Sequence, residues 1–301
     1  MKIVPFTDEH VDAAAELLAA RHERHRAAEP LLPGDVDFRA EVEKEWAVDG
    51  ASGVISADGY VFGAPARQRW FSVGVCGHAV SGDAEHARDL YAAAAGAWAG
   101  AGHSSHVVFL PASDPALIDA WFRLSFGASG ALGMRETDAE PEPYDGGVRV
   151  RQGTRDDFDA AASLEVTLHE ALLPSPSFSD LTPQSREEAA AEWRADTDDE
   201  KYELFVAERD GRIVGHVLLY RRPPDLRVPP DSIDLAQAST EPAARGTGVG
   251  RALTAHAIRW AHEHGYPAMT IDWRMTNLWA SRFWPRRGFR TSFLRLHRWI
   301  G

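Results

Sequence analysis

The run Ser239-Thr-Glu-Pro-Ala-Ala-Arg245-Gly-Thr-Gly-Val-Gly250-Arg251 decides how this sequence is interpreted. Its three alternate glycines stand between a predicted strand, Ser232 to Ala238, and a predicted long helix that ends near His264. Glycines let the backbone approach a ligand closely and turn successive N–H groups into one concavity, while the helix N-terminus adds the positive end of its dipole. Arginines on either side add charge-assisted donors. We therefore predict an anion site here, most simply one for a pyrophosphate.

Two widespread phosphate-loop patterns do not fit this run. In the dinucleotide pattern G-x-G-x-x-G, the place of the third glycine is held by Arg251. The Walker pattern is also absent, because no Gly-Lys-Ser/Thr follows the first glycine. Neither of these two loop types therefore accounts for the predicted anion site.

The spacing Arg-x-x-Gly-x-Gly after a strand, with Pro242 three residues before Arg245, resembles motif A of the GNAT superfamily of acyl-CoA N-acyltransferases. Downstream, Asn277-Leu-Trp-Ala280-Ser-Arg-Phe-Trp284-Pro-Arg-Arg-Gly-Phe289 is similar to that family's motif B, Asn-x-x-Ala-x-x-x-Tyr-x-x-x-Gly-Phe. The resemblance covers residues 148–301 closely. It implies a mixed α/β sheet in which the strand at Ser232–Thr240 splays from the strand at Ala268–Trp273, so that acyl-CoA enters the gap.

The same resemblance implies a set of residues that bind acetyl-CoA, the co-substrate, without a metal. Backbone groups near Ser239 and Thr240 would pair with the pantetheine arm, the loop amides would hold the pyrophosphate, and Asn277 would bond the arm from the other side. The complete set is Ser239, Thr240, Arg245, Gly246, Thr247, Gly248, Val249, Gly250, Arg251, Asn277 and Ala280.

Catalysis by direct attack of an amine on the thioester needs a proton acceptor and a protonated leaving thiolate. Strand alternation puts Asp234 on the face of Ala236, Ala238 and Thr240, where its carboxylate could be the base; a role in capping or solvating the strand end is equally open. Weaker candidates for the base are Glu241, Asp272 and His169. The family's usual acid is the motif B tyrosine, and here that position is Trp284, whose indole does not release a proton at ordinary pH. Water or another residue must then protonate the thiolate.

The chain also contains an internal repeat. The segment from Ile3 to Leu17 resembles that from Val150 to Leu164, with Thr154 147 positions after Thr7. Later segments align 163 positions apart, among them Trp121 with Trp284. We therefore predict two tandem homologous domains of mixed α/β fold, with a linker at Thr137–Gly147.

The first copy, residues 1–138, is predicted to be degenerate. Gly82-Asp-Ala-Glu-His-Ala87 stands where the glycine loop should be, and its two acids would repel a pyrophosphate. Asp114 stands in the place of Asn277. This half would shape the acceptor cleft, while residues 148–301 form the catalytic domain. Four tryptophans of the first half are expected in its core: Trp46, Trp70, Trp98 and Trp121.

Composition narrows the function further. The 301 residues carry 45 acidic against 32 Lys and Arg side chains, a formal net charge of −13, which disfavours nucleic acid and suits a cationic amine acceptor, although charge also serves solubility. A single cysteine, the lack of a leader and the lack of an apolar run of about 18 residues predict a cytoplasmic protein without membrane contact. Three histidines, His256, His262 and His264, have a spacing that is poor for a metal site.

We therefore predict an N-acetyltransferase that acts on a primary amine of a small molecule or peptide and that is a monomer or a homodimer. Two alternatives remain open at this point. One is a non-catalytic acyl-CoA-binding or scaffold protein, suggested by Trp284, and the other is a nucleotide-binding module.

Overall fold

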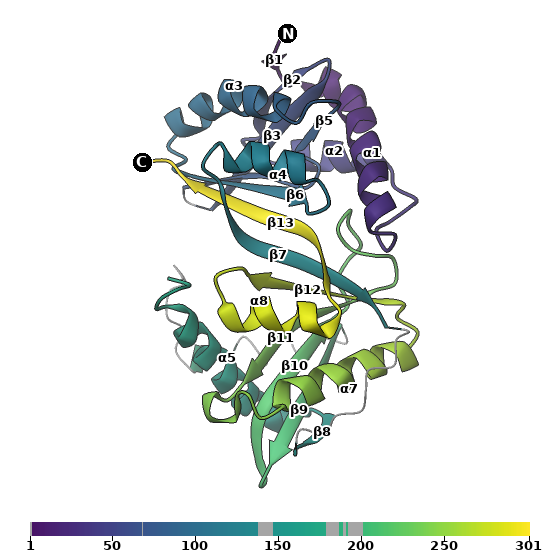
Figure 1. Ribbon diagram of the computed structural model, residues 1–301, viewed down its shortest axis with the longest axis vertical. Helices are drawn as coiled ribbons and strands as arrows, with labels where there is room; N and C mark the ends of the chain where they lie inside the picture. Colours follow the sequence, from purple (N-terminus) through teal and green to yellow (C-terminus); the bar gives the residue numbers. More distant parts are fainter. Residues whose placement is uncertain (1, 68, 138–146, 179–186, 189–190, 192–200) are drawn as a thin grey trace. The chain divides into compact units, whose positions relative to one another are not determined.

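The computed structural model describes residues 2–67, 69–137, 147–178, 187–188, 191 and 201–301 (Figure 1). Most of the predicted linker, residues 138–146, lies outside the described residues. The chain forms two compact units. Unit 1 contains Met1–Leu132, Asp225–Arg227 and Thr291–Gly301, and unit 2 contains Gly133–Pro224 and Val228–Arg290.

Unit 1 is a mixed sheet with helices packed on it. Its strands are ordered β1-β2-β3-β4-β6-β13, and β5 pairs with β3. The β4–β6 pair is parallel, whereas β3 pairs antiparallel with both β2 and β4. In chain order its elements are β1 (Val4–Pro5), α1 (Val11–Ala28), α2 (Phe38–Trp46), β2 (Ser52–Ser56), β3 (Gly59–Arg67), β4 (Trp70–Val73), β5 (His78–Val80), α3 (His86–Gly100), β6 (Ser105–Pro111), α4 (Pro115–Phe122), the first part of β7 (Gly127–Glu136) and β13 (Arg290–Trp299) from Thr291 onwards.

The last strand of the chain belongs to unit 1. The sequence predicts that this strand completes the second half, but β13 pairs antiparallel with β6, from Phe293 opposite Pro111 to Trp299 opposite Ser105 (Figure 1). The physical reason is burial: Phe293 is 1% and Leu296 0% exposed, and Leu296 is part of the core of unit 1.

Unit 2 has the strand order β12-β11-β10-β9-β8, in which only the β11–β12 pair is parallel. The Asp210-Gly211 turn joins β9 and β10, with φ of 51° and 73°, as the sequence predicts for a tight hairpin. The elements are β8 (Arg149–Gln152), α5 (Phe158–Leu172), β9 (Tyr202–Arg209), β10 (Arg212–Tyr220), β11 (Ile233–Thr240), α7 (Val249–Glu263), β12 (Ala268–Arg274) and α8 (Leu278–Phe283), followed by the short helix η4 (Pro285–Arg287).

Helices α5 and α7 cover opposite faces of the sheet in unit 2. Leu204 and Val206 of β9 pack with α5, whereas the ring of Phe205, between them in sequence, contacts His256 and Trp260 of α7. Because successive strand residues point to opposite faces, these contacts assign one face to each helix. We call them the α5 face and the α7 face.

The two halves begin in the same way. Thr7 forms a capping box with His10, and Thr154 forms one with Asp157; in each case one short 3₁₀ turn leads into the long helix. The repeated start agrees with the repeat seen in the sequence.

Candidate functional site

The glycine loop connects β11 to α7 through the short helix η3 (Pro242–Ala244). Gly246 has φ of 76° and Gly248, the N-cap of α7, has φ of 97°. Both values lie in the left-handed region, which favours glycine over residues with a Cβ atom. The loop conformation therefore requires glycine at these two positions for backbone reasons alone.

The backbone amides at this turn are available to a ligand. In the first turn of α7, the amide of Ala252 donates to the carbonyl of the N-cap Gly248 at 2.9 Å. In the described part of the chain, the amides of Gly246, Gly248, Val249 and Gly250 have no acceptor. Four donors at the positive end of a 15-residue helix form a site that suits an anion.

The backbone conformation that explains glycine at positions 246 and 248 does not apply at Gly250. It is helical, and a Cβ added there would lie 3.6 Å from Phe283 and 3.7 Å from the Thr240 hydroxyl, which is ordinary contact. The protein itself could therefore accept alanine at this position. Glycine here leaves the surface of the turn without a side chain.

Arginines surround the loop. The Nε of Arg245 donates to the carbonyl of Thr240 at 3.3 Å, which fixes the start of the loop, and Thr247 donates to the carbonyl of Ala244 at 2.8 Å. The pKa of Arg287 is lowered, first by burial and then by the positive charges of Arg251 and Arg286. These like charges indicate a region that an anion would stabilise.

Strands β11 and β12 part beside this loop. Their parallel ladder comprises Ile233–Leu235 opposite Met269–Ile271, whereas β11 continues to Thr240 and β12 to Arg274. The resemblance to the family implies such a splay between these two strands. Residues 236–240 of β11 therefore lie beyond its ladder with β12.

A bulge in β11 changes the predicted orientation of Asp234. Leu218 of β10 pairs with Gln237 but Leu219 pairs with Leu235, so Ala236 is the extra residue. As a result, Asp234 lies on the α5 face, while Ala238 and Thr240 lie on the α7 face. The prediction that Asp234 shares the face of Ala238 and Thr240 is wrong, because simple alternation does not survive a bulge.

Two polar side chains of β11 are tied to their neighbours on the α5 face. The Thr270 hydroxyl donates to Oδ1 of Asp234, and the Ser239 hydroxyl donates to the carbonyl of Leu164 in α5 at 2.9 Å. Asp234 is 7% exposed. Of the weaker candidates, Glu241 forms an ion pair with Arg212 at 3.0 Å, and Asp272 is exposed.

Asn277 caps α8. Its side-chain oxygen accepts from the amides of Trp279 and Ala280 at 3.1 and 3.2 Å, which leaves its NH₂ group as the possible donor to a ligand. In unit 1, Asp114 caps α4 in the same way, accepting from the amide of Leu117 at 2.9 Å. The two positions that align in the sequence thus have the same structural role.

Trp284 is buried and packs on aromatic neighbours. It is 7% exposed, and its ring meets the rings of Phe283 and Phe289 nearly at right angles, with centroids 4.8 and 5.7 Å apart. Trp121 and Phe126 of unit 1 form a matching pair at 4.9 Å. A packing role accounts for the contacts of Trp284.

Two polar groups on the α5 face were not predicted from the sequence. Glu165 of α5 is 8% exposed; its Oε1 lies 3.2 Å from Nε2 of His169, and its Oε2 lies 3.9 Å from Nε2 of His216 in β10. Gln237 occupies the α5 face next to the bulge. One signal was present: Glu165 and His169 are four residues apart on one helix, a spacing at which side chains interact.

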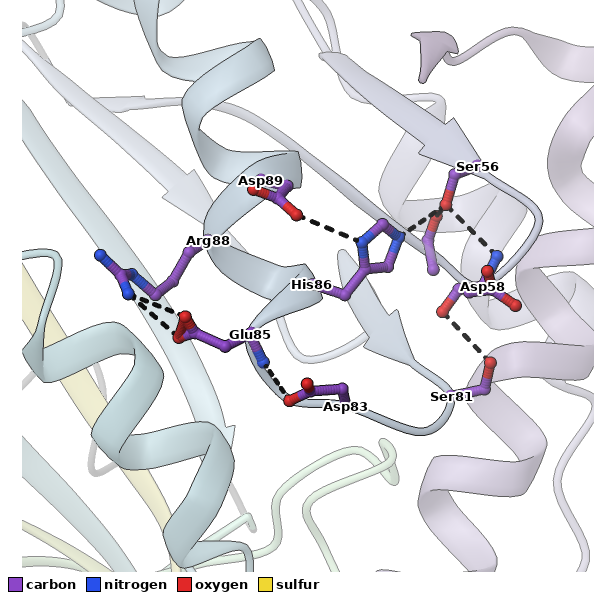
Figure 2. Close-up of polar contacts among 9 residues, drawn as sticks. Ser56, Asp58, Ser81, Asp83, Glu85, His86, Arg88 and Asp89 are labelled. Carbon is purple, nitrogen blue, oxygen red and sulfur yellow. Dashed lines mark hydrogen bonds and ion pairs between the residues drawn. The ribbon is translucent and has the colours of Figure 1, made fainter. Parts of the chain in front are cut away.

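In unit 1 the loop that corresponds to the glycine run is filled by its own groups (Figure 2). Oδ1 of Asp83 accepts from the amide of Glu85 at 2.9 Å, and the carbonyl of Asp83 accepts from the amide of His86. The Glu85 carboxylate pairs with Arg88 and Arg123. The amides of Glu85 and His86 in this segment are thus bonded within the chain.

The place where β4 and β6 part is also filled by side chains of unit 1. Nε2 of His78 lies 2.7 Å from the carbonyl of Phe109, and Arg21 donates to the carbonyl of Val75 at 2.7 Å. Glu45 accepts from the amide of Cys76 at 3.0 Å. Burial raises the pKa of Glu45 and lowers that of His78 to about 3.

Trp98 and Trp121 lie in the core of unit 1, as predicted, whereas Trp70 stacks on His297 and Trp46 donates to Asp8. Among the described residues, no group of His, Cys, Asp and Glu is arranged to hold a metal ion. Within the same residues, no helix combines the length and hydrophobicity needed to cross a bilayer.

Unit 2 is thus a mixed α/β domain in which parted parallel strands are followed by a glycine turn with open amides at a helix N-terminus. Residues 166–289 match the model of the acetyltransferase (GNAT) family, and the chain therefore carries a GNAT acetyltransferase domain. A mycothiol acetyltransferase from Thermomonospora curvata is 33% identical over 87 residues, a match that spans 29% of this chain and 27% of that protein's length.

Solved structures show the same fold over the whole chain. A GCN5-related N-acetyltransferase from Sphaerobacter thermophilus has a TM-score of 0.63 at 15% identity and is matched over 99% of this chain and 96% of that one. A tandem GNAT protein from the clavulanic acid biosynthesis pathway has a TM-score of 0.55 at 14% identity, with 100% and 98% covered. At these identities the likeness concerns the fold alone.

Proposed function

We propose that unit 2 is an N-acetyltransferase that moves the acetyl group of acetyl-CoA to a primary amine of a small-molecule or peptide acceptor. One observation carries this proposal: four backbone amides, from Gly246 to Gly250, have no acceptor among the described residues and lie at the start of α7. A pyrophosphate satisfies such donors, and the family uses a cofactor that contains one.

The rest of the cofactor fits the surrounding elements. Main-chain groups of Ser239 and Thr240 lie where β11 has left its ladder with β12, so they can pair with the pantetheine arm. The NH₂ group of Asn277 can donate to the arm from α8, beside Ala280. Arg245, Thr247 and Arg251 complete the set by fixing the loop and adding positive charge.

The reaction is a direct transfer. The amine nitrogen attacks the thioester carbon, the N–C bond forms, the C–S bond breaks and the sulfur leaves as a thiolate. One proton of the acceptor ammonium goes to a base before attack, and the second ends on the sulfur. Asp234, on the α5 face, is the base that the sequence suggests.

Trp284 occupies the acid position of motif B without supplying a proton, so water protonates the thiolate in this proposal. Its contacts also favour a second candidate function, an acyl-CoA-binding protein without turnover, because the indole does no more than pack and donate a hydrogen bond.

Unit 1 is proposed to be the degenerate copy that shapes the acceptor site. The internal bonds of Asp83 and the polar side chains between β4 and β6 support this role, since both occupy places that acyl-CoA would use.

The experiment is calorimetry with acetyl-CoA, followed by an assay for thiol release in the presence of amines. Binding with release in the presence of an amine supports the enzyme, and binding without release supports the second candidate. NAD and ATP serve as controls, and preferential binding of either one contradicts the proposal.

A further inference from the structure

The α5 face of unit 2 carries two buried oxygen atoms that have no hydrogen-bond partner among the described residues. They are Oε2 of Glu165 and Oε1 of Gln237. An unpaired buried acceptor is costly, because it has lost water without gaining a donor. Two such atoms call for a ligand that brings N–H groups, such as an amine.

Their position matches the reacting end of acyl-CoA in the proposed function. Gln237 directly follows the bulge residue Ala236, in the stretch of β11 beyond its ladder with β12. Glu165 reaches toward His216, and His216 pairs across the strands with Ser239. Both oxygens therefore lie along the same few residues of β11.

The opposite face of β11 serves the cofactor. The Thr240 side chain lies on the α7 face, near Gly250 at the start of α7. A cofactor on that side and an acceptor on the α5 side would meet at the part of β11 that has left its ladder with β12.

We propose that Glu165 is the proton acceptor for the amine substrate, that Gln237 accepts a second N–H of the same nitrogen, and that His169 passes the proton to solvent. The inference rests on the proposed function and deepens it, since it assigns the proton acceptor to a residue outside the glycine loop and motif B.

The neighbours of Glu165 suit this role. His169 lies 3.2 Å from Oε1 and its side chain is 31% exposed, so it connects the buried carboxylate to water. His216 is fully buried; burial lowers its pKa to about 4, so it is uncharged at neutral pH and adds no positive charge to repel an ammonium. Asp234, the base that the sequence suggests, lies farther along the same face, and its Oδ1 already accepts from the Thr270 hydroxyl. In this inference Glu165 therefore replaces Asp234 as the proton acceptor.

The ammonium gives one proton to Glu165, and the neutral nitrogen attacks the thioester carbon. The N–C bond forms, the C–S bond breaks, and the second proton of the nitrogen ends on the thiolate. Glu165 then loses its proton through His169.

The test uses the full chain with acetyl-CoA and four amines: spermidine, kanamycin, glycinamide and n-butylamine. Glu165→Gln keeps the shape of the side chain and removes the base, so kcat/KM should fall about 100-fold at pH 7. The loss should shrink as pH rises, because more of the amine is then already neutral. Affinity for acetyl-CoA and the melting temperature should not change.

Matched variants separate this role from a structural one. Glu170→Gln makes the same change at an exposed position of α5 and should have no effect. At pH 7, Asp234→Asn should lower kcat/KM less than Glu165→Gln does. His169→Ala should lower kcat/KM about tenfold, and added imidazole should restore part of the activity.

The inference is overturned if Glu165→Gln retains full activity, or if its loss is the same at every pH. It is also overturned if acetyl-CoA binds but none of the four amines is acetylated. Failure of acetyl-CoA to bind at all is a different result, which removes the proposed function itself.

Discussion

The indole ring of Trp284 meets the ring of Phe289 at an interplanar angle of 86°, and Trp121 and Phe126 repeat this contact in unit 1 at 89°. The second pair belongs to the hydrophobic core of unit 1, so its tryptophan has a packing role. The same geometry at Trp284 explains why an indole occupies the position at which the family usually has a tyrosine.

Replacing Trp284 should separate packing from chemistry. Trp284→Phe should cost about 1–2 kcal/mol of stability, because part of the buried ring is lost, and should leave turnover within about threefold, because neither ring donates a proton. Trp284→Tyr supplies a phenol of pKa near 10 and should raise turnover about tenfold. Thermal melts and thiol-release assays measure both, and a large loss of turnover in the phenylalanine variant would show that the indole takes part in the reaction.

Gly250→Ala tests the purpose of the last loop glycine. The added Cβ lies in ordinary contact with Phe283 and Thr240, and alanine favours helix, so stability should rise by about 0.5–1 kcal/mol. Affinity for acetyl-CoA should nevertheless fall about tenfold, as the methyl group blocks backbone approach. Gly96→Ala in α3, where a Cβ meets nothing within 4 Å, is the control and should change stability alone. Unchanged affinity in Gly250→Ala would contradict the assignment.

The arginines near the loop should make binding depend on salt. Affinity for acetyl-CoA should fall several-fold between about 0.05 and 0.5 M salt, because exposed charges are screened. Arg251→Gln should bind more weakly and with a smaller salt dependence. Titrations at two salt concentrations measure both effects, and an unaltered salt dependence would exclude Arg251 from the anion site.

His25 should make unit 1 sensitive to acid. Burial, followed by the charge of Arg21, lowers the pKa of His25 from 6.5 to about 4. Between these values the unfolded chain binds a proton that the folded chain does not, so the free energy of unfolding falls as pH drops from 6.5 toward 4. The slope for one such group is at most about 1.4 kcal/mol per pH unit. Denaturant melts at several pH values measure this effect: in His25→Gln the free energy of unfolding should fall less steeply below pH 6.5 than in the native chain. An identical pH dependence would assign the effect to other groups.

Local features could be predicted from the sequence because their causes are local. Asp-Gly between two apolar runs is typical of a hairpin turn, and Asp210-Gly211 has positive φ at both residues. Threonine is a common residue at a helix start, and Thr154 forms the capping box there. The end of α7 also agrees, since Gly265 has φ of 79° just after the helix.

Features that depend on partners distant in the chain were not predicted. The pairing of β13 with β6 depends on where Phe293 and Leu296 are buried, which periodicity does not reveal. The bulge at Ala236 reversed the orientation of Asp234, because one extra residue shifts a strand by half its period. In the sequence, Glu165 resembles any exposed charged residue of a helix. Its burial follows from the packing of α5 against β10 and β11.

Calorimetric titration of the full chain with acetyl-CoA tests the central claim most directly. We expect one site per chain, heat of binding that persists in the Asp83→Ala variant, and loss of binding in the Gly248→Val variant. Two sites per chain, or no binding at all, would contradict the assignment of the anion site to the turn between Arg245 and Arg251.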